Sequence, residues 1–240
     1  MPPMWLANRL FPSVRRLQAR LAELERKNGK RQPIETHLSA EHRAFRDKFI
    51  AMLLERPPGL LLEIGARNRT SPDRKPPVPP GWRYEGLDVA PDVWVTIIGD
   101  AHNLSLQRCS VDAIFSGAVF EHLLMPWKVA LEMNLVLRIG GLAYVSSHQT
   151  FPLHEMPADY WRFSANAWRA LFNKDTGFRI IETKMIGPAK VVADVEDQTL
   201  RDLHTLPAYL LSMMIAQKTH ETILRWDVDP HEVWPLEYPR

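Results

Sequence analysis

The chain is poor in several features that mark whole classes of protein. Cys109 is the only cysteine among 240 residues, so no disulfide can form within the chain, which is typical of a reducing compartment. The longest apolar runs, such as residues 209–216, fall far short of the roughly 20 residues that cross a bilayer. The first residues also lack the uninterrupted apolar segment of a cleaved signal peptide. These absences predict a cytoplasmic protein.

An excess of one sign of charge is also lacking. The net charge is only +2, which argues against a dedicated nucleic-acid-binding protein. The charge is unevenly placed, because residues 1–31 hold eight Lys or Arg and two Glu. Over the whole chain, 45% of the residues are apolar and 24% are charged, as in an ordinary globular protein. Its length is enough for one large domain with additions.

Residues 13–27 have the spacing of a helix, and Asn28-Gly29 is expected to end it. Apolar residues recur there at alternating steps of four and three, as in a coiled coil, over about two heptads. Three interpretations stay open: a helix packed on its own domain, a helix for self-association, or a basic helix lying on an anionic membrane as a peripheral contact. We therefore predict a basic helical extension over residues 1–34. Its apolar positions are Leu10, Val14, Leu17, Leu21 and Leu24.

Strands and helices alternate through the middle of the chain. Residues 71–81 hold five prolines, which makes a regular helix improbable there. Strands separated by helices predict a doubly wound, mostly parallel α/β sheet of the Rossmann-like type. A Gly187-Pro188 link predicts an antiparallel pair at its end. Expected strands are 60–64, 83–88, 94–100, 111–116, 142–147, 178–185 and 190–195, and expected helices are 39–55, 126–137 (capped by Gly140-Gly141) and 165–173.

Two further boundaries follow from this pattern. The α/β domain is predicted over residues 35–196. Residues 197–240 are predicted to add a helix at about 199–225 and an irregular tail rich in Trp and Pro.

Acidic residues end three successive predicted strands. Glu63 lies before the Gly65 turn, Asp88 ends the second strand, and Asp100 ends the third. Ligands of open α/β sheets bind outside the carboxyl ends of the strands. A carboxylate there can accept two hydrogen bonds from the vicinal diol of a ribose. The turn after Gly65 lacks the second and third glycines of a dinucleotide fingerprint, which disfavours a nicotinamide-dependent oxidoreductase.

Over about residues 55–190 the chain resembles class I S-adenosylmethionine-dependent methyltransferases of the broad type 11 group. The resemblance rests on the order and spacing of several short motifs. They are Leu-Leu-Glu-Ile-Gly (61–65), Gly-Leu-Asp (86–88), Gly-Asp-Ala-His (99–102), Val-Asp-Ala-Ile-Phe-Ser (111–116), Phe-Glu-His-Leu (120–123) and Glu-Met-Asn-Leu-Val-Leu-Arg-Ile-Gly-Gly (132–141), the last with Ile139 where proline is usual.

The resemblance implies S-adenosylmethionine as cofactor and assigns residues to it. Asp88 would hold the ribose hydroxyls and Val89 would pack on the adenine, while Arg67 could pair with the cofactor carboxylate. The adenine edge would meet Asp100, Ala101 and His102. The methionine part would be contacted by Glu63, Ile64, Gly65, Ala66, Ser116 and Gly117.

Histidines are the candidates for acceptor chemistry, because a neutral hydroxyl or amine must lose a proton on methylation. His148 follows the fifth strand and His154 lies in an aromatic and charged loop, so we rank both above His122, which neighbours Glu121. Each could equally be a hydrogen-bonded structural residue. No metal site is expected, because the histidines lack helical i, i+4 spacing and no cysteine cluster exists. Acceptor binding, or alternatively an internal salt bridge of the loop, is assigned to Asp159, Tyr160 and Arg162.

The sequence therefore predicts a methyltransferase that acts on a small-molecule or glycan-type acceptor. The alternative is a catalytically inactive scaffold of the same fold, in which the altered turn after Gly65 has damaged the cofactor site.

Overall fold

A computed structural model of the chain describes residues 34–67, 76–193, 200 and 202–234. Residues 41–240 form one compact unit and residues 1–40 another. The helix expected at 13–27 lies outside the described residues.

The described residues of the larger unit contain a seven-stranded sheet with the order β3-β2-β1-β4-β5-β7-β6. Its first five strands run parallel, and β7 is antiparallel to both of its neighbours. The order reverses between β1 and β4, which is where an open α/β sheet leaves a crevice for a ligand. This architecture confirms the doubly wound, mostly parallel fold. The strands are β1 (Leu60–Ile64), β2 (Arg83–Asp88), β3 (Ile97–Ile98), β4 (Val111–Gly117), β5 (Leu137–His148), β6 (Phe178–Ala189) and β7 (Ala208–Lys218).

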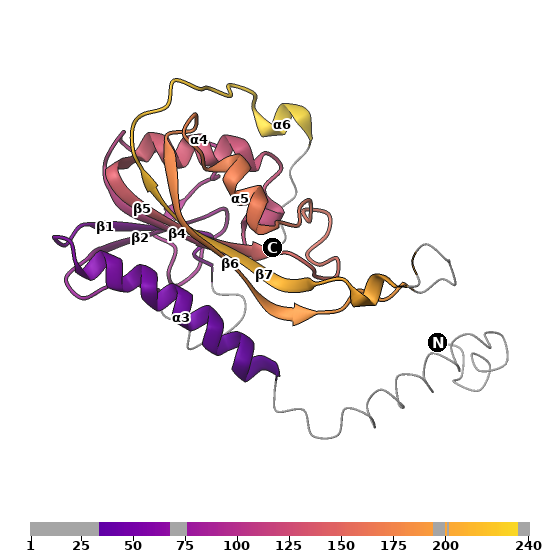
Figure 1. The fold of residues 1–240 in the computed structure, drawn as a ribbon. Helices are drawn as coiled ribbons and strands as arrows, with labels where there is room; N and C mark the ends of the chain where they lie inside the picture. Colours follow the sequence, from indigo (N-terminus) through magenta and orange to yellow (C-terminus); the bar gives the residue numbers. More distant parts are fainter. Residues whose placement is uncertain (1–33, 68–75, 194–199, 201, 235–240) are drawn as a thin grey trace. The chain divides into compact units, whose positions relative to one another are not determined.

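Helices cover both faces of the sheet (Figure 1). α4 (Pro126–Val136) and α5 (Ala165–Leu171) lie on one face, and the part of α3 (Ile34–Leu54) from Glu41 onward lies on the other. Pro126 suits the first turn of α4, because the amide hydrogen that it lacks would have no partner there. Three short helices complete the described elements: η1 (Phe120–His122), η3 (Leu203–Thr205) and α6 (Pro230–Val233).

The alternation of side chains along β4 and β5 builds the core on each face. Toward α3, the rings of Phe115 and Tyr144 stack with centroids 4.6 Å apart, and Phe49 packs against both. On the α4 face, Ile114 and Val145 belong to a buried cluster that includes residues from α4 and α5. The side chains of the two central strands are buried on both faces, so the loops at their carboxyl ends start from fixed positions.

The C-terminal part of the sheet corrects the sequence prediction. Residues 208–218 form β7 and not part of a helix at 199–225, so the sheet extends past the boundary expected at residue 196. This segment is a short, nearly continuous apolar run, and periodicity alone cannot tell a buried strand from a buried helix. The strand expected to end at Met185 continues through Gly187-Pro188 to Ala189, and described residues 190–193 form no strand.

Two smaller predictions were also wrong. The strand expected at 94–100 is limited to Ile97–Ile98, because residues 94–96 belong to the loop that enters it. Gly140 and Gly141 do not cap α4: the chain enters β5 at Leu137, and both glycines lie within that strand. Gly140 has φ +85°, and the pairing of β4 with β5 shifts register between Val111 and Ala113 nearby. The other expected strands and helices occur within a few residues of their predicted bounds.

Among the described helices, none combines the length and the apolar character needed to cross a membrane.

Candidate functional site

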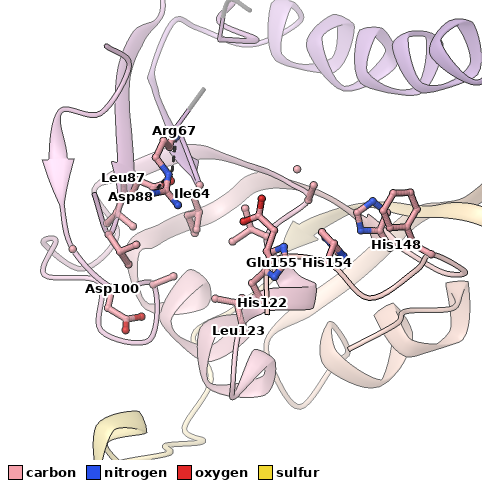
Figure 2. A pocket seen from close by; sticks show the side chains of 18 residues that line it. Ile64, Arg67, Leu87, Asp88, Asp100, His122, Leu123, His148, His154 and Glu155 are labelled. Atoms are coloured by element: carbon pink, nitrogen blue, oxygen red, sulfur yellow. Dashed lines mark hydrogen bonds and ion pairs between the residues drawn. The ribbon is translucent and has the colours of Figure 1, made fainter. Parts of the chain in front are cut away.

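A cavity of about 390 Å³ opens at the carboxyl ends of β1, β2, β4 and β5 (Figure 2). We name its two ends by their residues. The acidic end contains Gly65, Asp88 and Asp100, and the histidine end contains His122, His148 and His154. Strands from both sides of the order reversal supply these residues, so the fold itself brings the two ends together.

Gly65 shapes the turn at the acidic end. Its φ is +82°, in the left-handed region that side chains disfavour. A Cβ placed on it would lie 2.0 Å from Val119 Cγ2. The Gly65 amide donates to Leu87 O at 2.8 Å, which holds the turn against the end of β2. Only glycine fits this position, which accounts for the one glycine in a turn that has no others.

Asp88 presents a carboxylate to the cavity with part of its hydrogen-bonding capacity already used. Its Oδ2 accepts from the Arg67 amide at 3.1 Å, and its Oδ1 from the Ala90 amide at 3.4 Å. The Arg67 Nε lies 3.7 Å from Oδ1 and has no hydrogen-bond partner in the described part of the chain. Because a carboxylate can accept about four hydrogen bonds, Asp88 retains sites for a diol.

His102 has a structural position behind this end of the cavity. It is fully buried, with Nδ1 2.6 Å from Asp100 Oδ1, and its Nε2 accepts from the Met125 amide at 3.1 Å. The imidazole therefore joins the loop after β3 to the start of α4. Asp100 and Ala101 themselves line the cavity.

Most of the residues assigned to the cofactor from sequence do line the cavity, and four do not. Glu63 is buried behind the wall, where it accepts from the Tyr84 hydroxyl at 2.8 Å. Ala66, His102 and Ser116 are also buried and absent from the lining. Direct contact of these four with a cofactor remains a prediction. The lining includes Ile64, Gly65, Arg67, Asp88, Val89, Asp100, Ala101 and Gly117.

At the histidine end, Glu121 and His148 form a close pair. Glu121 Oε1 lies 2.7 Å from His148 Nδ1, and Glu121 Oε2 accepts from the Ser147 hydroxyl at 2.5 Å. Burial alone would raise the pKa of Glu121, but its contacts with His148 and Ser147 outweigh burial and leave it lowered. A buried negative charge therefore stands directly behind His148 at neutral pH.

His154 lies between the other two histidines. Its ring centroid is 4.9 Å from that of His148 and 4.8 Å from that of His122. The His122 Nδ1 donates to Ala158 O at 2.5 Å, which leaves its Nε2 as the basic nitrogen. Phe151 stacks on His148 with centroids 4.1 Å apart and lines the cavity beside it. All three imidazoles line the cavity.

Asp159 and Arg162 fasten the loop that carries His154. Two hydrogen bonds of 2.6 and 2.8 Å join Arg162 to Asp159, and Arg162 also donates to Phe151 O and Pro152 O. The Arg162 hydrogen bonds hold the pKa of Asp159 well below its usual range, and Asp159 raises the pKa of Arg162. Neither residue lines the cavity, nor does Tyr160, whose amide donates to Glu121 O. The internal salt bridge foreseen as one alternative is thus the arrangement found.

Sequence reasoning missed several residues of the site. Ala118 and Glu155 line the cavity in left-handed backbone conformations, with φ of 55° and 52°. Such strain concentrates at functional sites, but nothing in the sequence marks it. The partnership of Glu121 with His148 was missed because Glu121 was paired in sequence with His122. The remaining lining residues not assigned from sequence are Leu87, Gly99, Val119, Leu123 and Phe151.

The structure also brings together side chains of the kinds that bind metal ions. Their spacing in the sequence did not predict this. One ligand atom each from Glu121, His148 and His154 lie within 4.8 Å of one another, and the same holds for His122, His154 and Asp159. We expected no metal site because the histidines lack helical i, i+4 spacing and no cysteine cluster exists. Neither criterion detects ligands that come together from separate loops.

Comparison with known proteins finds a family model that matches part of this chain, including several residues of the site. A family model for a methyltransferase domain matches residues 83–145, from β2 into β5. The matched segment carries Asp88, Asp100, Gly117 and Glu121. A comparison with curated proteins finds no significant match.

Solved structures share the fold at low sequence identity. A proposed methyltransferase from Bacillus halodurans has a TM-score of 0.51 and 12% identity, over 72% of this chain and 99% of that one. A proposed sarcosine dimethylglycine methyltransferase from Galdieria sulphuraria has a TM-score of 0.50 and 13% identity, over 80% and 92%. The YcgJ protein from Bacillus subtilis has a TM-score of 0.50 and 15% identity, over 73% and 97%.

Proposed function

We propose that this chain, which has a class I S-adenosylmethionine-dependent methyltransferase domain, transfers a methyl group to a neutral hydroxyl or amine of a small acceptor. The observation that carries the proposal is the single cavity that joins the acidic end, suited to a nucleoside, to the histidine end, suited to an acceptor. A methyltransferase needs both sites side by side, because the two reacting atoms must be held in line within a dry space.

The acidic end fits S-adenosylmethionine, which supplies an electrophilic methyl group when bound. Asp88 has unused hydrogen-bond capacity for the ribose hydroxyls. Gly65 lacks the Cβ that would clash with Val119, so its turn can pack there while its backbone lines the cavity beside the cofactor. Leu87 and Val89 offer apolar surface for the adenine, and the Arg67 Nε is a buried donor without a hydrogen bond. The single-glycine turn therefore retains the features on which cofactor binding depends.

The histidine end supplies the base. His148 lines the cavity, with the carboxylate of Glu121 2.7 Å from its Nδ1. That arrangement leaves Nε2 as the nitrogen that accepts the acceptor's proton. The negative charge of Glu121 stabilises the imidazolium that forms. His154, whose ring lies against that of His148, is the second candidate for this role.

The walls of the histidine end favour a small acceptor with an apolar part. Phe151 and Leu123 line it beside His148 and His122 (Figure 2), and imidazoles provide most of its polar groups. A glycan-type acceptor remains the alternative within the same proposal, since the stacked Phe151 could also pack on a sugar ring.

Turnover on an acceptor panel tests this proposal. The purified chain is incubated with S-adenosylmethionine and a panel of phenols, small amines and sugars, and S-adenosylhomocysteine formation is measured. We expect formation that depends on an acceptor and falls in His148→Gln. No turnover on any class of acceptor, with intact cofactor binding, would instead support the inactive scaffold.

A further inference from the structure

We propose that Glu121, His148 and His154 form a binding site for a divalent transition-metal ion of the zinc class. This inference goes beyond methyl transfer, because it concerns binding of an ion at the histidine end whether or not an acceptor is methylated.

The three residues converge although they come from separate segments. Glu121 belongs to η1 after β4, His148 ends β5, and His154 lies in the following loop. One ligand atom of each lies within 4.8 Å of the other two. Zinc binds imidazole nitrogen and carboxylate oxygen at about 2.0–2.2 Å, so its ligand atoms stand roughly 3.3 Å apart. Binding would therefore require side-chain rotations that bring the three atoms to that spacing.

Within this group, Glu121 and His148 lie close together but do not form a well-oriented hydrogen bond. Glu121 Oε1 and His148 Nδ1 are 2.7 Å apart, yet each is a buried atom without a hydrogen bond of acceptable geometry in the described part of the chain. The Glu121 side chain is fully buried. A buried carboxylate oxygen and a buried imidazole nitrogen that face each other without a good hydrogen bond suit coordination to a shared cation.

The surroundings of the third ligand also fit. His154 Nδ1 lies 3.3 Å from both Pro152 O and Asp159 Oδ2, while its ring packs against that of His148. Acceptors of this kind fix the ring of a metal-bound histidine by taking the proton on its second nitrogen. His148 and His154 both line the cavity, so a fourth position would face the acceptor space.

The neighbouring set of His122, His154 and Asp159 is a weaker candidate. Arg162 donates to both carboxylate oxygens of Asp159, so the charge of that group is already neutralised. Glu121 has no Arg or Lys among its described ion pairs and keeps its charge for a metal ion.

Metal binding has a consequence for the proposed reaction. The ion would take the lone pairs of His148 Nδ1 and Glu121 Oε1, and the single proton of the neutral imidazole would then reside on Nε2. Nε2 would no longer have a lone pair for the acceptor's proton, and Glu121 would no longer stabilise a protonated His148. We therefore expect added zinc to inhibit methyl transfer and a chelator to restore it.

Metal titration of the full chain tests the site directly. Chelator-treated protein is titrated with Zn²⁺ by calorimetry and with Co²⁺ by visible absorption. We expect one ion per chain and at least about tenfold weaker binding in both Glu121→Gln and His154→Ala. His154→Ala is the safer variant for folding, because that loop side chain is partly exposed. The matched control is His220→Ala, which removes an exposed histidine outside the cavity lining and should bind as the unaltered chain does.

Two results would overturn the inference: no binding of either ion at a 1:1 ratio, or equal affinity in His154→Ala and His220→Ala. Titration with S-adenosylmethionine on the same preparations separates this failure from failure of the proposed function. Loss of metal binding alone, with cofactor binding retained, removes only the metal site.

Discussion

Glu121 and His148 lie 27 residues apart in sequence, and their side chains meet at 2.7 Å inside the cavity wall. Glu121 reaches this position because η1 turns the chain sharply after β4, and His148 because β5 lies directly beside β4. The pair gives the histidine end a carboxylate-supported imidazole, in the same cavity whose acidic end we propose to hold the cofactor.

Substitution of either member of this pair should slow the chemical step. Loss of a general base typically costs about 10²–10⁴-fold in rate, so we expect a fall of that order in kcat for His148→Gln. Glu121→Gln should lower kcat by at least about tenfold, because the neutral amide cannot stabilise an imidazolium. Steady-state kinetics on the acceptor identified by the panel measure both effects.

The Michaelis constant for S-adenosylmethionine provides the internal control for these variants. It should stay within about threefold of the unaltered value, because neither residue belongs to the acidic end. An unchanged kcat in His148→Gln would exclude His148 as the base and direct attention to His154 and His122.

Gly65→Ala should impair cofactor binding more than its size implies. The added Cβ would lie 2.0 Å from Val119 Cγ2, and the φ of +82° is unfavourable for alanine by about 1–2 kcal/mol. We expect a lower melting temperature and a cofactor affinity reduced by at least about tenfold. Thermal unfolding with and without S-adenosylhomocysteine measures both quantities.

The double variant Gly65→Ala, Val119→Ala separates the two causes. Removal of the Val119 methyl groups relieves the clash and leaves the backbone strain, so recovery should be partial. Full recovery would contradict a contribution from backbone strain, whereas no effect of Gly65→Ala in the first place would contradict the close approach of this turn to Val119.

Arg162→Ala should destabilise the loop that carries His154. It leaves the Asp159 carboxylate without its main partner, at a cost of about 2 kcal/mol. The Asp159 pKa is depressed in the folded state, so its contribution to stability is complete above the ordinary aspartate pKa of about 3.9 and declines as pH falls below it. The stability difference between the two proteins should therefore be full at pH 7 and shrink below about pH 4.

Denaturant unfolding at pH 7 and at pH 3 measures this difference, with Arg169→Ala as the control. Arg169 is an exposed arginine on α5 in the same part of the chain. A stability difference for Arg162→Ala that is independent of pH, or matched by Arg169→Ala, would argue against the Asp159 pair as its source.

Much of the fold could be predicted because its strands are short, apolar and bounded by clear signals. β1, whose last residue follows Glu63, and β2, which ends in Asp88, were both predicted with the correct bounds, because glycine and proline residues flank these strands in the sequence. β7 could not be predicted in the same way, because its apolar run gains its identity only by pairing with β5 and β6. The prediction that Gly140 caps the preceding helix was wrong for a related reason. A glycine with positive φ occurs in an irregular strand as readily as at the end of a helix.

The residues of the candidate site also differ in how far the local sequence could predict them. Asp88 and Gly65 were expected at this site because the local sequence encodes their position at a strand end, and both line the cavity. The contact of Glu121 with His148 was missed because side-chain partners across loops depend on three-dimensional packing, and its neighbour in sequence, His122, hydrogen-bonds instead to Ala158 O. His102 was assigned to the cofactor by its place after Asp100; its ring is buried and outside the cavity lining, and its contact with a cofactor stays a prediction.

Calorimetric titration with S-adenosylmethionine and S-adenosylhomocysteine tests the central claim most directly, with Asp88→Asn beside the unaltered chain. Charged hydrogen bonds contribute about 1.5–3 kcal/mol each, so a loss of about 10–100-fold in affinity is expected for Asp88→Asn. Asp92→Asn, in the neighbouring loop and outside the cavity lining, should bind normally. Micromolar binding that weakens only in Asp88→Asn is the result we predict. Absence of binding at millimolar ligand, or equal binding by Asp88→Asn, would contradict the assignment of this cavity to the cofactor.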